Sequence, residues 1–258
     1  MWQIQSTLFI NFLYVEDCKV SKLNTMLKNF STLIAIVLCA SILGNAQITT
    51  FEDFKASSEG LIIYKDSKKG KIDYEKTALA LAELYPLDKH DAVSHSIIFN
   101  VPGKTAEQIY VEVNNWFIHS FKSGKSVIQL NDKDAGCVIG KGYVDALGST
   151  AGFSNNSEAA AWVILRADIK DEKVRVIATI QSYEVTKTTG VGMALLGATP
   201  QAPKVVEYIP NECFPYTKKE KGTGSKALTL AHCWIVTMFD QLNDAIVNGI
   251  TGFEDDDF

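Results

Sequence analysis

The sequence predicts an α+β fold in which a long C-terminal helix packs on an antiparallel sheet. Two long runs alternate apolar and polar residues and are joined by a short polar turn, which requires antiparallel neighbours. One amphipathic helix precedes these runs, and a longer one closes the chain. With 258 residues, of which 47% are hydrophobic and 21% charged, the chain has the composition of an ordinary globular domain with a small extension.

An N-terminal region is expected over residues 47–93. The stretch 61–74, LIIYKDSKKGKIDY, is typical of a hairpin around the polar turn Lys68–Lys71. The following stretch, 75–86, predicts a short helix that Pro86 stops.

The main domain is expected over residues 94–250. SIIFNV at 96–101 is a short β-type run that ends at Pro102. Thr105 and Gln108 then form a capping box, which predicts the start of a helix. Apolar residues on one face of this helix predict that it packs on the core: Ile109, Val113, Trp116, Phe117 and Phe121.

A series of strands follows this helix. SVIQL leads through the turn NDKDAG into CVIGKGYVDA. In the next run, AAAWVILRADI, every second residue from Ala161 to Ile169 shares one face, and the turn KDEK joins it to a strand with Val174, Val176, Ala178 and Ile180 on one face.

The C-terminal third divides into three parts. Residues 186–224, rich in glycine and proline, predict a long irregular loop, and its apolar run GMALLGA (192–198) is either a recognition surface or a strap packed on the core. A helix with Gly249 near its end follows, and residues 251–258 form an acidic tail. The apolar stripe of this helix predicts contact with the sheet through Leu228, Ala231, Ile235, Met238, Leu242 and Ala245.

The N-terminus has the order of a secretory signal. Lys28 precedes the apolar run 33–43, and the small residues Gly44 and Ala46 follow it. The run is too short for a membrane span, which needs about 20 apolar residues. We therefore expect a signal peptide at 26–46, a mis-assigned start over 1–25, and an exported protein of the periplasm or cell envelope that has no transmembrane anchor after cleavage.

Two observations argue against binding to nucleic acid: the chain has a net charge of −5, and no stripe of basic residues is present. Three cysteines lie beyond the signal segment: Cys137, Cys213 and Cys233. An odd number leaves at least one thiol free, and the sequence does not choose a disulfide pair among them.

The stretch DAGCVIGKGYVDA (134–146) resembles a phosphate-binding loop at first sight. Three residues separate Gly136 from Gly140 where a Walker A loop has four, and Gly142 occupies the hydroxyl position. The glycines also lie within a strand pattern instead of before a helix, where amides would face an anion. We therefore predict that this stretch binds no nucleotide.

The same region resembles an exported domain family of Bacteroidetes, which has no known function and a fold like that of the TATA-box-binding protein. The resemblance rests on VPGK at Val101, the helix end at Trp116–Ser123, VIQ at Val127 and the pattern from Asp132 to Gly142, with ECFPY (212–216) as a further similarity. It covers residues 96–183 best. It implies a β-α-β-β-β-β-α order, which the elements above also show, and it implies no activity.

Catalytic, cofactor-binding and metal-binding residues are not identified by the sequence. The histidines His90, His95, His119 and His232 lack metal-ligand spacing, and no cofactor is expected. The favoured interpretation is a non-catalytic envelope module that binds a protein, a glycan or a small apolar ligand. The alternative is a hydrolase in which Cys213 and His232 meet as a thiolate–imidazole pair.

Overall fold

A computed structural model describes residues 48–53, 64, 71–120, 127–197, 199 and 202–249. These residues belong to one compact unit that begins at Gly44. Most of the predicted hairpin at 61–74 lies outside the described residues, as do Phe121, the signal segment 26–46, residues 1–25 and the tail 251–258.

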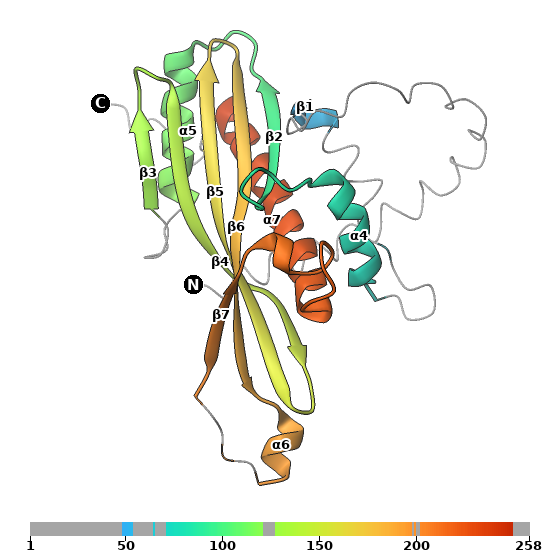
Figure 1. The fold of residues 1–258 in the computed structure, drawn as a ribbon. Helices are drawn as coiled ribbons and strands as arrows, with labels where there is room; N and C mark the ends of the chain where they lie inside the picture. The colour runs from blue at the N-terminus through green and yellow to red at the C-terminus, as the bar shows by residue number, and fades with distance from the viewer. Residues whose placement is uncertain are drawn as a thin grey trace, which may run out of the picture. The chain divides into compact units, whose positions relative to one another are not determined.

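A seven-stranded sheet forms the framework (Figure 1). Its strand order is β1-β2-β6-β5-β4-β3, and β7 pairs with the outer part of β6. Every pairing is antiparallel except that of β1 with β2. The strands are β1 (Ile48–Thr50), β2 (Val93–Asn100), β3 (Val127–Asp132), β4 (Cys137–Ala151), β5 (Asn155–Lys170), β6 (Lys173–Thr189) and β7 (Lys204–Tyr208).

Two helices pack on one face of this sheet and share a single apolar core with it. Helix α5 (Ala106–Ser120) begins at the predicted capping box, where the Thr105 amide donates to Gln108 Oε1 over 2.9 Å. Helix α7 (Lys221–Asn248) contacts β4, β5 and β6. The alternating residues of β5 and β6 that the sequence assigned to one face are the buried ones, so the α+β prediction is confirmed.

The apolar stripe of α7 differs from the predicted one at a single step. Leu228, Ala231, Ile235, Leu242 and Ala245 are buried as expected. Met238 is only partly buried, and Phe239 takes the central place with no exposed surface. A step of four from Ile235 to Phe239, instead of three, keeps the stripe aligned with the sheet at 3.6 residues per turn.

The N-terminal region joins this core directly. Strand β1 extends the sheet beside β2. Helix α4 (Tyr74–Leu84), close to the predicted bounds, is capped by Asp73 and packs against α7. The region 47–93 therefore contributes to the main core.

The prediction of an irregular loop over 186–224 is wrong. Strand β6 continues to Thr189, and the short helix α6 (Val191–Leu195) follows it. Strand β7 then returns along β6, and a 3₁₀ turn, η3 (Pro210–Glu212), leads toward α7, which begins at Lys221. Strand β7 is only five residues long and lies between Pro203 and Pro210. Its backbone hydrogen bonds go to β6, a distant part of the chain, and the local sequence pattern does not reveal this pairing.

Candidate functional site

Gly140 and Gly142 of the glycine-rich stretch lie inside β4, as predicted, whereas Gly136 lies in the turn before it. Gly140 pairs with Leu165 and Gly142 with Val163 of β5, so no helix N-terminus follows them. The Lys141 ammonium lies 4.8 Å from the centre of the Trp162 ring. This lysine therefore makes a cation–π contact across neighbouring strands, an ordinary way of packing a half-buried cation on a sheet.

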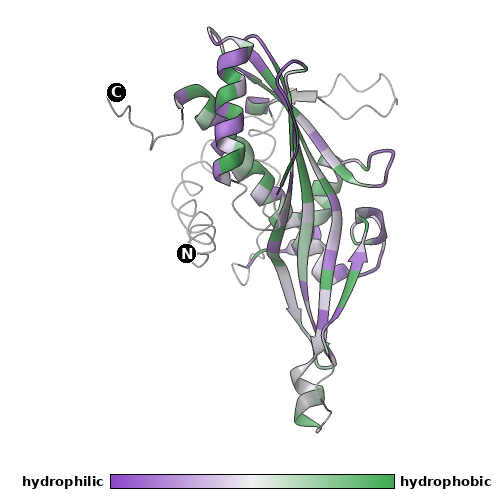
Figure 2. Ribbon diagram, turned by 90° about the vertical axis from the view of Figure 1, so that its left-hand side faces the viewer, coloured by the Kyte–Doolittle hydropathy of each residue, from purple (hydrophilic) through white to green (hydrophobic). Residues whose placement is uncertain are grey.

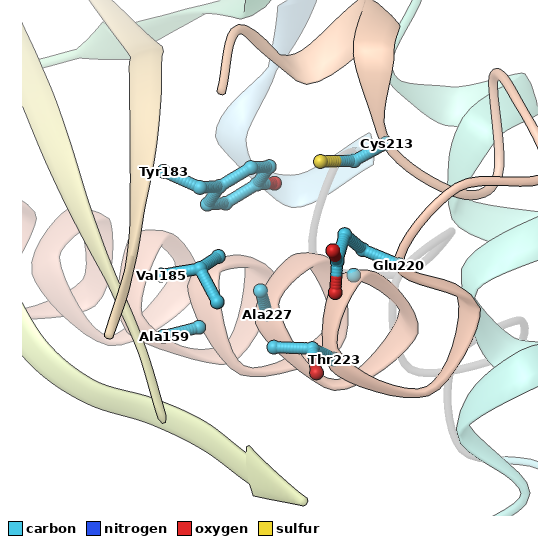
Figure 3. A pocket seen from close by; sticks show the side chains of 8 residues that line it. Ala159, Tyr183, Val185, Cys213, Glu220, Thr223 and Ala227 are labelled. Atoms are coloured by element: carbon cyan, nitrogen blue, oxygen red, sulfur yellow. The ribbon is translucent and has the colours of Figure 1, made fainter. Parts of the chain in front are cut away.

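Cys213 occupies a shallow recess between β5, β6 and the start of α7, where its side chain points toward Tyr183 (Figure 3). The recess encloses too little space for a water molecule. Burial raises the pKa of the Cys213 thiol to about 12, and the nearby Glu220 and Glu212 carboxylates add to this effect. Because the thiolate is the nucleophilic form, Cys213 is not activated for catalysis at neutral pH.

His232 lies well away from Cys213. A Cβ placed on Gly224 of α7 would lie 3.5 Å from the Cys213 Cβ, which fixes Cys213 beside Gly224. His232 is eight residues farther along the helix, or about 12 Å at 1.5 Å per residue. The predicted thiolate–imidazole pair therefore does not form, and the hydrolase alternative loses its site.

His232 instead belongs to a buried cluster with Tyr85 and His95. The Tyr85 hydroxyl and His232 Nδ1 share a hydrogen bond of 2.6 Å, and the Tyr85 ring stacks edge-on against both histidine rings. Burial lowers the pKa of His232 to about 3 and that of His95 to about 4. Both imidazoles are thus neutral at physiological pH and serve the core.

Metal-ligating side chains do not cluster within the described ranges: no group of three or more His, Cys, Asp or Glu residues is placed to hold an ion. The three cysteines in this part of the chain are free thiols. No described helix is long and apolar enough to cross a membrane.

The sheet carries an arm whose end extends beyond the helices (Figure 1). We call residues 148–161, 183–197 and 202–208 the arm; they comprise the outer parts of β4, β5 and β6 together with α6 and β7. Thr189 lies four residues, or about 13 Å of strand, beyond the buried Val185. The arm therefore carries its end clear of the apolar core.

The end of the arm, which we call the tip, is formed by residues 152–154 and 190–197. The Gly190 amide donates to the Ser154 carbonyl over 2.8 Å, and the Met193 amide donates to the Phe153 carbonyl over 3.1 Å. Within the turn itself, the Gly152 amide donates to the Asn155 carbonyl over 3.0 Å. These bonds fasten the β4–β5 turn to α6.

Two glycines allow this close approach. A Cβ on Gly190 would lie 2.4 Å from the Gly152 carbonyl oxygen, and one on Gly192 would lie 2.1 Å from the Phe153 ring. Real side chains do not tolerate such distances, so each position requires glycine for the tip to close. The Phe153 ring consequently lies on the backbone of α6.

The large side chains that the tip presents to solvent are apolar. Leu195 is 83% exposed, Leu196 73%, Phe153 65% and Met193 36%. The turn and α6 appear in pale to green colours at the end of the molecule in Figure 2. This cluster answers the question that the sequence left open for GMALLGA: the run is an exposed surface and not a strap on the core.

Charged residues are absent from both segments that build the tip. Neither 146–157 nor 188–203 contains Asp, Glu, Lys or Arg, although such residues make up 21% of the chain. The two segments meet because Asn155 pairs with Thr189 and Asn156 with Thr188. The first charged neighbours toward the body are Glu158 and the cross-strand pair Lys187 and Lys204.

The base of the arm is tied to the body by an ionic contact. Glu220, which precedes α7, accepts a hydrogen bond from Lys187 Nζ and another from the Tyr208 hydroxyl over 3.2 Å. The lysine and the glutamate are half-buried, and the hydrogen bond to Glu220 raises the pKa of Lys187. One carboxylate thereby joins β6 and β7 to the start of the helix.

Sequence reasoning located only half of the tip. It identified 192–198 as an apolar run in an unusual place, but it gave no role to Phe153. Phe153 becomes significant only when β5 and β6 align and bring its turn beside α6. The signal that could have found it is the missing charge in two segments flanking the ends of adjacent strands.

Comparison with known proteins gives a family and a fold. Residues 96–184 match the family model described as "Domain of unknown function (DUF4468) with TBP-like fold". Two similar solved structures are a TBP-like protein from Parabacteroides distasonis, with 14% identity and a TM-score of 0.45, and a DUF4468 family protein from Bacteroides ovatus, with 16% identity and a TM-score of 0.40. The similarity covers 63% and 62% of this chain, and 96% and 90% of theirs. No curated protein matches.

The matched range begins within β2 and ends within β6, so it contains α5 and the strands β3 to β5. The motifs on which the resemblance rested lie in this range, apart from ECFPY. The resemblance inferred from the sequence is therefore confirmed: residues 96–184 match the model of the DUF4468 domain of unknown function with a TBP-like fold.

Proposed function

We propose that this protein is a non-catalytic binding module and that the tip of its arm is the contact site. The observation that carries the proposal is the cluster of exposed Phe153, Met193, Leu195 and Leu196 on a fastened backbone. The largest apolar patch on a soluble monomer is often functional, and larger patches mark interaction sites.

The construction of the tip supports this interpretation. Burying Leu195 and Leu196 against the body would gain roughly 1.5–3 kcal/mol for each side chain. The fold leaves both leucines exposed, and the backbone hydrogen bonds of Gly190 and Met193 hold the apolar side chains away from the core. A surface maintained at such a cost is best explained by a partner that covers it.

The chemistry of the rest of the molecule supports a binding role over catalysis. Cys213 is a protonated, buried thiol, and His232 is a neutral core residue. The recess beside Cys213 has no room for a small ligand. The sequence left a protein, a glycan or a small apolar ligand as partners. A partner with an extended surface fits the tip better than a small apolar molecule does.

We also propose that the module works in the cell envelope. The support is the order of Lys28, the apolar run 33–43 and the small residues before Gln47. An exported location would place the tip among envelope surfaces.

Site-specific photo-crosslinking in the source cells tests the contact site. A photoreactive amino acid replaces Leu195 in one variant and Val111, a 50% exposed residue of α5, in a matched control. We expect crosslinked adducts from position 195 and none of comparable yield from position 111. The yield at position 195 should fall when Leu196→Ser is added, because serine removes part of the apolar contact.

Equal yields at the two positions would show that the tip has no special role. An absence of adducts at position 195 would likewise overturn the proposal, since a contact site must lie within reach of its partner.

A further inference from the structure

The size of the tip limits what can cover it. At 150–250 Å² for a large side chain, the exposed parts of the four apolar residues amount to roughly 390–640 Å². A stable protein interface buries about 800 Å² on each partner. The tip is thus too small for a self-sufficient interface with a second copy of this chain.

The composition of the tip matches that of protein interfaces only in part. Phenylalanine and methionine are enriched at interfaces, but Tyr, Trp and Arg carry most of the binding energy there, and leucine is under-represented among the residues that do. Here the centre has two leucines, a methionine and a phenylalanine. The surrounding residues of 146–157 and 188–203 are mostly small or hydroxyl-bearing and carry no charge. An uncharged segment can enter the boundary between lipid headgroups and acyl chains without desolvating an ion, which is the main cost of insertion.

The arrangement of the tip fits a soft, extended partner. Helix α6 lies at the end of the arm (Figure 1). None of the four apolar residues lines the recess described above (Figure 3). A projecting apolar group needs a matching socket in a protein, whereas a lipid surface deforms around it. Polar Ser154, Asn155 and Thr189 follow within a few residues, at the level where headgroups would provide hydrogen bonds.

From these observations we infer that the tip inserts Phe153, Met193, Leu195 and Leu196 into the surface of a lipid bilayer. The inference rests on the proposed contact site and names its partner. Because the inserted segment is uncharged, binding through the tip does not require anionic lipid and is insensitive to salt.

A fluorescent amino acid that responds to its environment provides a test at a single position. It replaces Leu195 in one full-length variant and Val111 in the control, and each is titrated with phosphatidylcholine vesicles. We expect a blue shift at position 195 and none at position 111. The vesicle concentration that gives half of the shift should stay constant between about 50 and 500 mM salt. Over this range the electrostatic screening length changes roughly threefold, so a charge-dependent interaction would weaken. A local readout is needed because the apolar run 33–43 is also present in the full chain.

Substitutions then separate the tip from other surfaces. With the probe at position 195, Phe153→Ser combined with Leu196→Ser should raise the half-shift vesicle concentration at least about tenfold. Leu79→Ser, at a 54% exposed position on α4, should leave it unchanged.

Each outcome decides one proposal. An unchanged spectrum at position 195, or a shift that the tip substitutions do not weaken, overturns lipid insertion. If crosslinks from position 195 in cells then join a protein, the tip remains a contact site with a different partner. If position 195 gives neither a shift nor a crosslink, the proposed function fails as well.

Discussion

At the scale of single residues, the most informative group is the buried pair His95 and His232 around Tyr85. Burial is the first cause of the lowered pKa of both imidazoles, and their mutual repulsion lowers that of His232 further. A second tyrosine, Tyr216, donates its hydroxyl proton to the Tyr85 carbonyl over 2.6 Å. The cluster is a polar part of the core that is more stable when its histidines are neutral.

We expect the protein to lose stability as the pH falls below about 6.5. Unfolded histidine takes up a proton near that value, whereas the folded His95 and His232 do so only near 4 and 3. Stability due to neutral histidine is therefore complete above the unfolded pKa and is lost as the pH falls toward the folded values. Over this window the free energy of unfolding should fall by about 1.4 kcal/mol per pH unit for each histidine.

Chemical denaturation at pH 7, 6 and 5 measures this dependence. His232→Gln should lower the stability at pH 7 and also flatten its pH dependence. His90→Gln, at an exposed loop position, should leave the dependence as it is in the parent protein. An identical pH dependence in the parent and His232→Gln would show that the cluster titrates normally.

Exposed and buried leucines give a second contrast at this scale. Leu195→Ser and Leu196→Ser together should change the free energy of unfolding by less than about 1 kcal/mol, the range expected for two surface substitutions. Urea titration of the double variant checks this value. A large loss of stability would mean that the tip packs on the body in solution, which would remove the basis of the proposed contact site.

At the scale of elements, α7 connects the sheet with the other two long helices. It packs on β4, β5 and β6, on α4 and on α5, and its buried face continues from Thr223 to Ile246. An isolated helix of this kind gains little stability from propensity alone, so the sheet and the helix stabilise each other by burying one another's apolar faces.

Two neighbouring positions on α7 test this dependence. Leu242 is 1% exposed, and its truncation in Leu242→Ala should cost about 2–5 kcal/mol. Asn243 lies about 100° around the helix and is less buried, so Asn243→Ala should cost far less. Guanidinium denaturation of both variants compares them directly. Similar, small losses would indicate that this face of α7 is not a core face in solution.

Elements with strong local patterns were the ones that the sequence revealed. The capping box at Thr105, the alternation around Val163 and the glycine after α7 all depend on neighbours within a few residues, and all are present. Strand β7 depends instead on hydrogen bonds to β6, with which it pairs from Lys187–Lys204 to Tyr183–Tyr208. These partners lie between 17 and 25 positions apart in the chain, so no local pattern marks this strand.

The candidate site was predictable only in part, for the same reason. The apolar run 192–198 is a local feature and was noticed. The contact of Phe153 with Gly192 requires two turns at the ends of neighbouring strands to meet, which depends on the register of β5 and β6. Likewise, the separation of Cys213 from His232 follows from where the loop before α7 meets the helix, beside Gly224.

At the scale of the whole molecule, charge and apolar surface are distributed unevenly. The chain has a net charge of −5, yet two segments without charged residues, 146–157 and 188–203, meet at one place. Lys187 and Glu220 connect the arm to the body just beyond these segments. The arm therefore joins a charged body to an uncharged apolar tip, which is the division expected of a module that stays in water and contacts a surface at one end.

The proposed location of this module leads to a prediction about its N-terminus. Lys28, the apolar run 33–43 and the small residues Gly44 and Ala46 stand in the order that a signal peptidase recognises. Cleavage after Ala46 would leave Gln47 as the first residue, immediately before β1, so the sheet would keep all of its strands. Mass spectrometry of the protein isolated from its source cells should therefore find a chain that begins at Gln47, in the envelope fraction. Replacing Ala46 with a bulky residue such as Phe should block this cleavage, whereas Ala56→Phe, beyond the cleavage site, should not. A native protein that retains residues 26–46 would contradict export, and the tip would then have to find its partner inside the cell.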